Sequence, residues 1–435
     1  MTNTAALHAD RRAGRLPRLP PDARKGLLAL GLGNTLEWYD WMVFGLLSAF
    51  IGPKFFPSDD PLTATLSALA VFAVGFAFRP LGGVLLGTLA DRIGRRRVML
   101  MSVTMMAVTT AIIAVSPTYE QIGPWAGFIL LLCRVVQGVS TGIEAPLSTT
   151  HAVELAPAGR EGLVAGRMSF FVNTGILLAS LVSFLTSLLL GGEAMSDWGW
   201  RVPFILGALF GLVVLYLRRS LPETMSADEL VESSSRTIWT GVRKNWLSVL
   251  AIVFVVGAAQ AYNYAWNVGL PSAARGVFRE DPTTVFALTT VLGVILVIGS
   301  WIVGTLVDGR AMSTWFLITR LLAIPSVFLM LLYVRPGIVA FAAVLLSGSI
   351  VLVLNLTLYN VVSASLMPKN CRGAGVSLGY GIGVALFGGT ASYLLVWLQS
   401  VGLDWVFPVY VSVLSIISVV LYLLARRSNG LFVGR

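Results

Sequence analysis

Apolar stretches recur along almost the whole chain, and this recurrence constrains the fold more than any other feature. A helix needs about 20 residues to cross the hydrocarbon core of a bilayer. Of the 435 residues, 56% are hydrophobic and only 12% are charged, so the chain cannot surround an apolar core with a polar surface in water. We therefore expect an all-α membrane protein in a lipid bilayer. Twelve stretches are candidate transmembrane helices: residues 27–51, 63–90, 98–116, 124–150, 163–190, 201–219, 246–272, 284–307, 313–333, 337–365, 373–398 and 404–425.

The distribution of Lys and Arg predicts the orientation of these spans. If both termini are cytoplasmic, 23 of the 31 basic residues lie on the cytoplasmic side or at the cytoplasmic ends of spans. Four lie outside (Lys54, Arg275, Arg279 and Arg335), and four are assigned to spans (Arg79, Arg134, Arg201 and Arg320). A frame shifted by one helix would reverse this ratio, and basic residues are enriched in loops that stay in the cytoplasm. We expect a multi-pass plasma-membrane protein with both termini in the cytoplasm. The same bias accounts for the net charge of +10, so no nucleic-acid partner is expected.

The longest polar interruption between the apolar stretches, residues 220–245, divides the twelve spans into two sets of six. It also separates two copies of a short sequence, because GTLADR at 87–92 ends the second span and GTLVDGR at 304–310 ends the eighth. Two related bundles that face one another across a central path are typical of secondary transporters. The expected parts are a flexible cytoplasmic tail (1–26), an N-terminal six-helix bundle (27–219), a cytoplasmic linker (220–245), a C-terminal six-helix bundle (246–425) and a cytoplasmic tail (426–435).

The sequence offers little for metal, disulfide or covalent chemistry. The two cysteines, Cys133 and Cys371, and the two histidines, His8 and His151, lack the spacing of a ligand set or a disulfide framework. A membrane enzyme or sensor would need a soluble domain, or a nucleophile with its base, and the sequence suggests neither. We expect no metal, no cofactor and no enzyme activity.

Acidic residues at membrane depth are candidates for proton coupling. A charge within hydrocarbon costs at least about 2.5 kcal/mol, so such side chains are expected to face a bundle interior. Glu37 and Asp40 share one helix face beside Tyr39, a candidate substrate contact, and Glu144 is a third acid within a span. Two acids on one face can share protons, because their repulsion favours the protonated form of one. The alternative is that each acid pairs with an arginine and holds helices together.

Two arginines are candidates for binding an anion. Arg134, Gln137 and Glu144 line one stripe of the fourth span, and Arg79 lies deep in the second span, next to Pro80. The planar guanidinium group matches a carboxylate. We expect Arg134 and Arg79 to bind a carboxylated solute, with an amide contact from Gln137. Alternatively, Arg134 pairs permanently with an acid and never meets substrate. Pro80 also predicts a break in its helix that frees backbone carbonyls.

The turn after the second span is predicted to be a gate at the cytoplasmic face. Its glycines allow neighbouring helices to approach closely, and its aspartate can accept hydrogen bonds from helix-terminal amides or from a nearby arginine. Breaking these contacts would release the state that is closed to the cytoplasm. A separate arginine follows two tryptophans near the external interface, where it is either an aromatic-belt anchor or a gate or substrate contact. The predicted gate residues are Gly87, Asp91, Arg92, Gly94, Arg95, Arg96 and, near the external interface, Arg201.

The second half of the chain has amides and polar-tipped aromatic residues, but no acid at membrane depth. These residues cluster in the seventh span and recur in the tenth and eleventh. We expect this half to supply hydrogen bonds and ring surfaces, whereas charge handling belongs to the first half. For many individual aromatic residues, helix packing is the alternative. The predicted substrate contacts in this half are Tyr262, Asn263, Trp266 and Tyr380.

Several motifs resemble those of one transporter family. They are Gly33, Asn34, Glu37, Trp38, Tyr39 and Asp40; the block from Arg79 to Arg97; Arg134, Gln137, Gly138, Gly142 and Glu144; Trp198, Gly199, Trp200, Arg201, Pro203 and Phe204, with Glu223 and Thr224; and Arg372, Gly373, Gly375, Tyr380, Phe387, Gly388 and Gly389. Together they resemble the metabolite:proton symporter family of the major facilitator superfamily. The resemblance implies a monomeric transporter of the bacterial inner membrane. The chain departs from the family pattern at Ile143 and at Thr390, where a glycine and a nearby proline are usual.

These observations predict a proton-coupled symporter that imports a small organic carboxylate, such as a di- or tricarboxylate, by alternating access. Its expected partners are this solute and the proton. Arg134 and Arg79 would attract the anion, and Asp40 or Glu37 would take the proton. Two alternatives keep the fold: proton-coupled uptake of a zwitterionic osmolyte such as proline or betaine, and proton-driven efflux of a small molecule.

Overall fold

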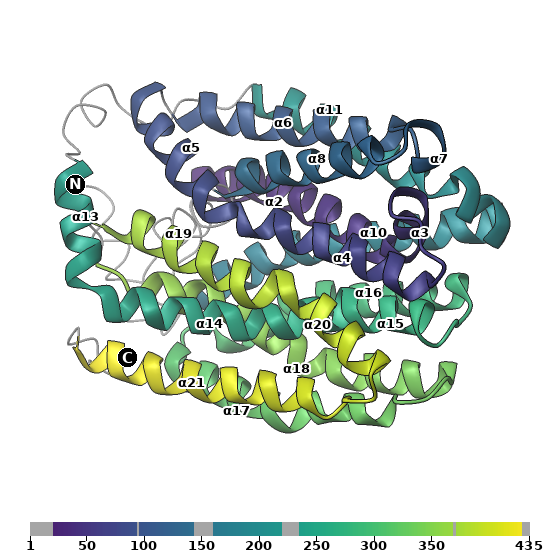
Figure 1. Cartoon of the computed structure of the whole chain (residues 1–435). Helices are drawn as coiled ribbons and strands as arrows, with labels where there is room; N and C mark the ends of the chain where they lie inside the picture. Colours follow the sequence, from purple (N-terminus) through teal and green to yellow (C-terminus); the bar gives the residue numbers. More distant parts are fainter. Residues whose placement is uncertain (1–20, 94, 143–159, 220–234, 369–370, 429–435) are drawn as a thin grey trace.

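The protein folds into two groups of nearly parallel helices. The structure is a computed structural model and describes residues 21–93, 95–142, 160–219, 235–368 and 371–428. One group holds the first half of the chain and the other holds the second half (Figure 1). The described ends of the chain and the helix α13 (Ser235–Lys244) lie toward the same end of the molecule. This common end is consistent with both termini facing one side of a membrane.

The first bundle contains six expected spans, of which the first and the second are each formed by two successive helices. Its elements are α2 (Pro21–Leu46), α3 (Ser48–Phe55), α4 (Pro61–Ala77), α5 (Arg79–Ile93), α6 (Arg95–Val115), α7 (Tyr119–Ile122), α8 (Trp125–Thr141), α10 (Glu161–Ala194), η1 (Met195–Gly199) and α11 (Arg201–Arg219). The predicted span 124–150 is described only as far as residue 142, since residues 143–159 lie outside the described ranges.

The second bundle repeats this arrangement after α13, a helix that lies within the predicted linker. Its elements are α14 (Trp246–Tyr264), η2 (Ala265–Gly269), α15 (Leu270–Gly276), α16 (Pro282–Val307), α17 (Met312–Val327), η3 (Phe328–Leu332), α18 (Ile338–Ser365), α19 (Arg372–Gly383), η5 (Val384–Gly388), α20 (Gly389–Ser400) and α21 (Val406–Ser428).

The lengths of the helices match those of a membrane protein. Within the described residues, nine helices are long and apolar enough to cross a bilayer, and Trp125–Thr141 and Arg201–Leu217 are shorter apolar helices. Together with the first span, formed by α2 and α3, they make the twelve spans that the sequence predicts. The first helix begins at Pro21, before the predicted boundary, because proline fits the first turn of a helix where its missing N–H is not needed.

Matching caps begin the second span of each half. Asp60 precedes Pro61, and its carboxylate accepts hydrogen bonds from the N–H groups of Leu62 and Thr63. Asp281 precedes Pro282 in the same way and accepts a bond of 2.8 Å from the N–H of Thr284. The side chain satisfies amide donors that the first turn of a helix leaves free. The two halves therefore share a local starting signal as well as a common architecture.

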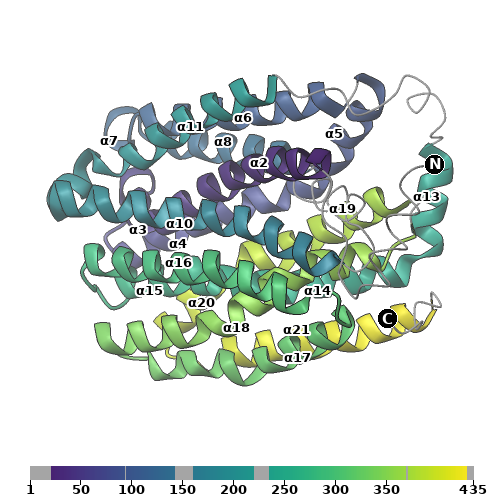
Figure 2. The same cartoon turned by 180° about the vertical axis from the view of Figure 1, so that it is seen from behind.

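Two seams join the bundles. Along one seam α10 packs on α16, as Figure 2 shows from behind. Small residues allow the close contact, because a Cβ atom added to Gly166 would lie 2.6 Å from the Cα atom of Gly304. Along the other seam α4 and α5 pack on α20 and α19, where a Cβ atom on Gly381 would lie 3.2 Å from the Cα atom of Pro80.

The spans that line the second seam are interrupted at mid-length. The helix of the second span breaks between α4 and α5, at Phe78, as expected from Pro80. In the other bundle, π-helical turns interrupt the seventh span at η2 and the eleventh at η5. Such turns misalign backbone hydrogen bonds and are frequent at functional sites. The interruptions place irregular backbone at the interface between the two bundles.

Candidate functional site

The first element of the candidate site is a buried ion pair between two spans of the N-terminal bundle. Arg79 Nη2 lies 3.1 Å from Glu37 Oε1, and both side chains are almost completely shielded from solvent. The guanidinium carbon lies 4.5 Å from the ring centre of Trp41 and 4.6 Å from that of Phe76. Rings in these positions attract the cation through their electron-rich faces. The break before α5 puts Arg79 at this depth.

The guanidinium group of Arg79 keeps unused donors. Its Nε and Nη1 atoms are buried and have no hydrogen-bond partner among the described residues. An arginine has five N–H donors in a fixed planar fork, and a carboxylate can accept two of them side by side. Arg79 can therefore bind a second carboxylate, or exchange Glu37 for one.

The second element is another buried ion pair, one turn further along the same face of α2. Arg134 Nη1, from α8, lies 3.3 Å from Asp40 Oδ2. Thr110, from α6, donates to the other oxygen of Asp40, and Gln137 donates to Thr110 over 3.1 Å. All four side chains belong to the N-terminal bundle and are buried. Both oxygens of Asp40 thus have partners inside one bundle.

Trp41 lies between the two pairs. Its ring centre is 4.5 Å from the guanidinium carbon of Arg79 and 5.5 Å from that of Arg134. Residues 37, 40, 41 and 44 follow the spacing of one helix face, and Phe44 lies under Arg134 at 3.9 Å. One face of α2 therefore presents both acids and the two rings that contact the arginines.

The two pairs differ in what they face. The Glu37–Arg79 pair faces the C-terminal bundle, where the Tyr264 and Tyr380 hydroxyls lie close enough to interact electrostatically with both charges. Tyr264 also stacks on Trp38, with ring centres 5.9 Å apart. Among the described residues, the Asp40–Arg134 pair has its hydrogen-bond partners in α2, α6 and α8 alone. The first pair therefore lies at the interface between the bundles, and the second lies within one of them.

A ladder of amides in the C-terminal bundle leads toward the first pair. Asn267 donates to the side-chain oxygen of Asn263 over 2.9 Å, Asn263 donates to Gln260 over 2.9 Å, and Gln260 donates to the Tyr359 hydroxyl over 2.8 Å. The Tyr359 hydroxyl interacts in turn with Tyr380. Every member is buried. The ladder aligns α14 with α18 and connects the neutral polar groups of this bundle to the charges of the other.

Of the predicted substrate contacts, the structure brings Arg79 and Tyr380 together across the interface and places Asn263 in the ladder. Three other aromatic residues bond elsewhere. The Tyr39 hydroxyl donates to the carbonyl oxygen of Pro203 over 2.7 Å. Tyr262 bonds with the hydroxyl of Ser326 and the carbonyl of Gly348, and stacks on Trp266 at 4.4 Å. These contacts are those of helix packing, and a substrate role for these three residues stays a prediction.

The predicted gate lies mostly outside the described part of the chain. Residues 94 and 143–159 are not described, and neither are the side chains at 91, 92, 95 and 96, so Asp91, Arg92, Gly94, Arg95, Arg96 and the proton-coupling candidate Glu144 stay predictions. Gly87 is described, and a Cβ atom added there would meet no described atom of another part of the chain within 4 Å. Arg201 donates to the carbonyl oxygen of Ala114 over 2.8 Å and lies over Trp200 at 4.4 Å. It thereby ties α11 to the end of α6.

A further polar contact joins the two bundles and was not predicted from the sequence. Asp308 follows α16, and its Oδ2 lies 2.6 Å from Nη1 of Arg160. Its Oδ1 accepts a hydrogen bond of 3.0 Å from the N–H of Leu163, in the first turn of α10. The sequence repeat that contains Asp308 marked this residue, but its partner lies 148 positions away in the other half. Asp308 and Arg160 join the two bundles at the end of the first seam.

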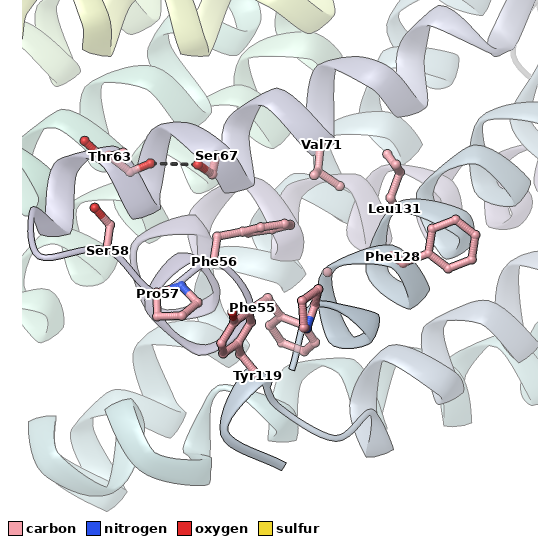
Figure 3. A pocket seen from close by; sticks show the side chains of 12 residues that line it. Phe55, Phe56, Pro57, Ser58, Thr63, Ser67, Val71, Tyr119, Phe128 and Leu131 are labelled. Carbon is pink, nitrogen blue, oxygen red and sulfur yellow. Dashed lines mark hydrogen bonds between the residues drawn. The ribbon is translucent and has the colours of Figure 1, made fainter. Parts of the chain in front are cut away.

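A pocket of about 560 Å³ opens at the other end of the N-terminal bundle (Figure 3). It lies between the α3–α4 connection and the α7–α8 region, and its lining includes Phe55, Phe56, Tyr119 and Phe128. None of the described residues that line it is acidic or basic. The pocket is therefore separate from the two ion pairs and has no group that matches a charged solute.

The paired bundles and the broken spans at their interface define a secondary transporter with the twelve-helix fold of the major facilitator superfamily. A family model described as "Sugar (and other) transporter" matches residues 27–238. The α-ketoglutarate permease of Escherichia coli (strain K12) is 30% identical over 415 residues, which cover 94% of this chain and 95% of that protein. The chain thus belongs to the metabolite:proton symporter family of this superfamily.

Other similar proteins differ in the solute that their names give. The proline/betaine transporter of Salmonella typhimurium is 29% identical over 409 residues, covering 89% of this chain and 80% of that protein. Among solved structures, the proton:xylose symporter XylE bound to 6-bromo-6-deoxy-D-glucose aligns with a TM-score of 0.72 over 92% of this chain and 94% of that one, at 18% identity. That structure supports the fold alone.

Proposed function

We propose that the protein is a proton-coupled symporter that imports a small organic carboxylate, such as a di- or tricarboxylate, with both termini in the cytoplasm. The observation that carries this proposal is the Glu37–Arg79 pair, which lies at the interface between the bundles and faces Tyr264 and Tyr380. An anion bound there would touch a cation from one bundle and hydroxyl groups from the other. Such a site is accessible to alternate sides when the bundles rock.

Charge balance at this pair provides the coupling. The guanidinium group of Arg79 can compensate the charge of one carboxylate, and in the empty site that carboxylate is Glu37. A substrate carboxylate that enters beside Arg79 adds a second negative charge, and like charges in a buried site favour proton uptake by one of them. We therefore assign the proton to Glu37 when substrate is bound. Release of the substrate restores the ion pair and releases the proton.

The Asp40–Arg134 pair has a supporting role in this scheme. Its carboxylate has partners on both oxygens, from Arg134 and Thr110, and Gln137 continues the network. The ring of Trp41 contacts both guanidinium groups, so a movement of Arg79 would alter the surroundings of Arg134. We propose that this pair holds α2, α6 and α8 as one unit while Glu37 exchanges its partner.

A zwitterionic osmolyte is the second candidate substrate. Trp41 and Phe76 flank Arg79, and Tyr264 lies edge-on to Phe76 with ring centres 5.0 Å apart. Aromatic faces of this kind attract a quaternary ammonium group. A betaine molecule could then place its carboxylate on Arg79 and its cationic head among the rings.

Uptake by membrane vesicles separates the two candidates. Labelled α-ketoglutarate and labelled betaine are offered to vesicles that hold the full-length protein, with and without an inward proton gradient. We expect gradient-driven accumulation of α-ketoglutarate and a loss of that uptake in Arg79→Gln, whereas the exposed arginine variant Arg335→Gln transports normally. Accumulation of betaine alone would replace the first candidate by the second. Substrate that leaves preloaded vesicles under the same gradient would contradict import.

A further inference from the structure

An unsatisfied arginine lies at the opposite end of the molecule from α13, where the two bundles also meet. Arg275 lies in the last turn of the short helix α15, and its guanidinium carbon lies 3.7 Å from the ring centre of Phe50 in α3. Phe286 of α16 lies 5.7 Å from the same carbon, and the two rings are 6.3 Å apart. Both phenylalanines are buried. The cation therefore rests between a ring of one bundle and a ring of the other.

The contact is part of a closed joint between α3 and α15. Ser48 Oγ lies 3.1 Å from Ser272 Oγ, and Ser272 also donates to the carbonyl oxygen of Gly45 over 3.4 Å. Thr65 packs on Gly276, where an added Cβ atom would lie 3.5 Å from it. When the bundles separate at this end, the contact between Arg275 and Phe50 must break.

The position of Arg275 leaves two of its three guanidinium nitrogens without hydrogen-bond acceptors among the described residues. Its Nε and Nη1 atoms are buried and have no hydrogen-bond partner among the described residues, and no described carboxylate lies within 4 Å of the group. A ring face compensates the charge of a guanidinium group but does not accept its N–H bonds in the plane of the fork. A ligand with two acceptor oxygens in one plane would satisfy those donors, and a carboxylate has that shape.

We propose that Arg275 is a second guanidinium site for the anionic substrate, at the outer mouth, which Phe50 covers while the bundles are closed and which binds a carboxylate when α3 and α15 separate. Arg79 then receives the anion deeper in the interface. This inference rests on the proposed function, because it requires an anionic substrate.

Uptake kinetics in right-side-out vesicles test the proposal, with labelled α-ketoglutarate as the probe. We expect Arg275→Gln to raise the KM for uptake about tenfold, which corresponds to about 1.4 kcal/mol. Arg279→Gln is the matched control, because Arg279 carries the same charge four residues further along the chain and is exposed. Its loss is expected to change KM less than about twofold, since exposed charges contribute little. Arg275→Lys, which keeps the charge and loses the fork, is expected to fall between wild type and Arg275→Gln.

A purely mechanical role for Arg275 gives a different result. If the arginine only latches the mouth, Phe50→Leu removes the same latch and reproduces the effect of Arg275→Gln on KM, which would overturn the proposal. A KM for Arg275→Gln equal to that of Arg279→Gln would overturn it as well. In either case the wild-type protein still accumulates α-ketoglutarate, whereas a wild-type protein without that uptake contradicts the proposed function itself. If Arg275→Gln does not reach the membrane, the KM of Arg275→Lys tests the proposal instead. A KM equal to that of wild type would exclude recognition of the carboxylate by the planar guanidinium group.

Discussion

The Asp40–Arg134 pair allows the sharpest test of the structure. Asp40→Asn keeps the size of the side chain and an oxygen for Thr110, but it leaves Arg134 buried without a counter-charge. At 3.3 Å and an effective dielectric constant of about 20, the lost attraction is about 5 kcal/mol. Removing one partner of a buried pair typically costs about 3–5 kcal/mol, because the other charge stays buried. We expect a loss of this size for Asp40→Asn and a similar loss for Arg134→Gln.

The double variant separates the ion pair from the loss of each side chain. Asp40→Asn with Arg134→Gln leaves two neutral amides that can bond with each other, so most of the lost stability should return. The coupling energy between the two changes is then about 3–5 kcal/mol. Unfolding of the purified protein by SDS in mixed micelles, followed by tryptophan fluorescence, measures each variant. Asp197→Asn is the control, because Asp197 is exposed and lies 3.6 Å from Lys54 in a surface pair.

Additive single losses would refute the reasoning. Additivity means that Asp40 and Arg134 do not interact in the folded protein, and the arrangement of α2 against α8 would then be incorrect. A loss below about 1 kcal/mol for Asp40→Asn, similar to that expected for a surface pair, would show instead that water reaches the pair. Either result would remove the argument that this pair holds three helices together as one unit.

Three further predictions follow from other parts of the molecule. Glu37→Gln should retain exchange of labelled substrate across vesicles but lose accumulation under a proton gradient, since a neutral side chain cannot release the proton; undiminished accumulation would exclude Glu37. Gly166→Val should slow transport at least tenfold and make the seam accessible to cysteine labelling, because its Cβ atom would lie 2.6 Å from the Cα atom of Gly304. The control Gly192→Val, where an added Cβ atom has open space, should change neither transport nor labelling. The hydrogen bond from the Thr63 side chain lowers the pKa of Asp60. The ionised Asp60 cap therefore stabilises the folded protein at pH values above the usual carboxyl pKa, and this stabilisation is lost on acidification. Between neutral pH and about pH 3, the unfolding temperature should fall less in Asp60→Asn than in wild type.

The sequence predicts the fold well because the bilayer restricts it so strongly. Apolar length predicts the number of spans. The basic loops predict their orientation across the membrane, which stays a prediction. Even the break in the second span follows from one residue, Pro80, which cannot donate a backbone hydrogen bond. The repeated Asp-Pro starts of α4 and α16 were equally visible in the sequence, at Asp60 and Asp281, although they carry no functional signal.

The pairing of the charges could not be predicted. Spacing places Glu37 and Asp40 on one face of a helix, but it does not say which arginine faces which acid, because that depends on the rotation and depth of two other helices. Thr110 gave no signal, since a single threonine in an apolar span is common. The partner of Asp308 was hidden for a similar reason: Arg160 lies in a different half of the chain, and only the packing of α10 on α16 brings it within 2.6 Å.

In the proposed symporter, the distribution of polar groups between the bundles would link substrate occupancy to closure. At the interface the first bundle contributes the charges of Glu37 and Arg79, and the second contributes the neutral hydroxyls of Tyr264, Tyr359 and Tyr380. Neither set can satisfy an anion alone, because Arg79 binds one end of it and its other oxygens need donors from across the seam. A bound carboxylate therefore interacts most favourably when the bundles are together, and a ligand shifts an equilibrium only toward the state that it binds better. In this proposal Glu37 pairs with Arg79 when no substrate is bound. The ion pair would then permit closure of the empty protein once Glu37 has released its proton, as the return step of a symporter requires.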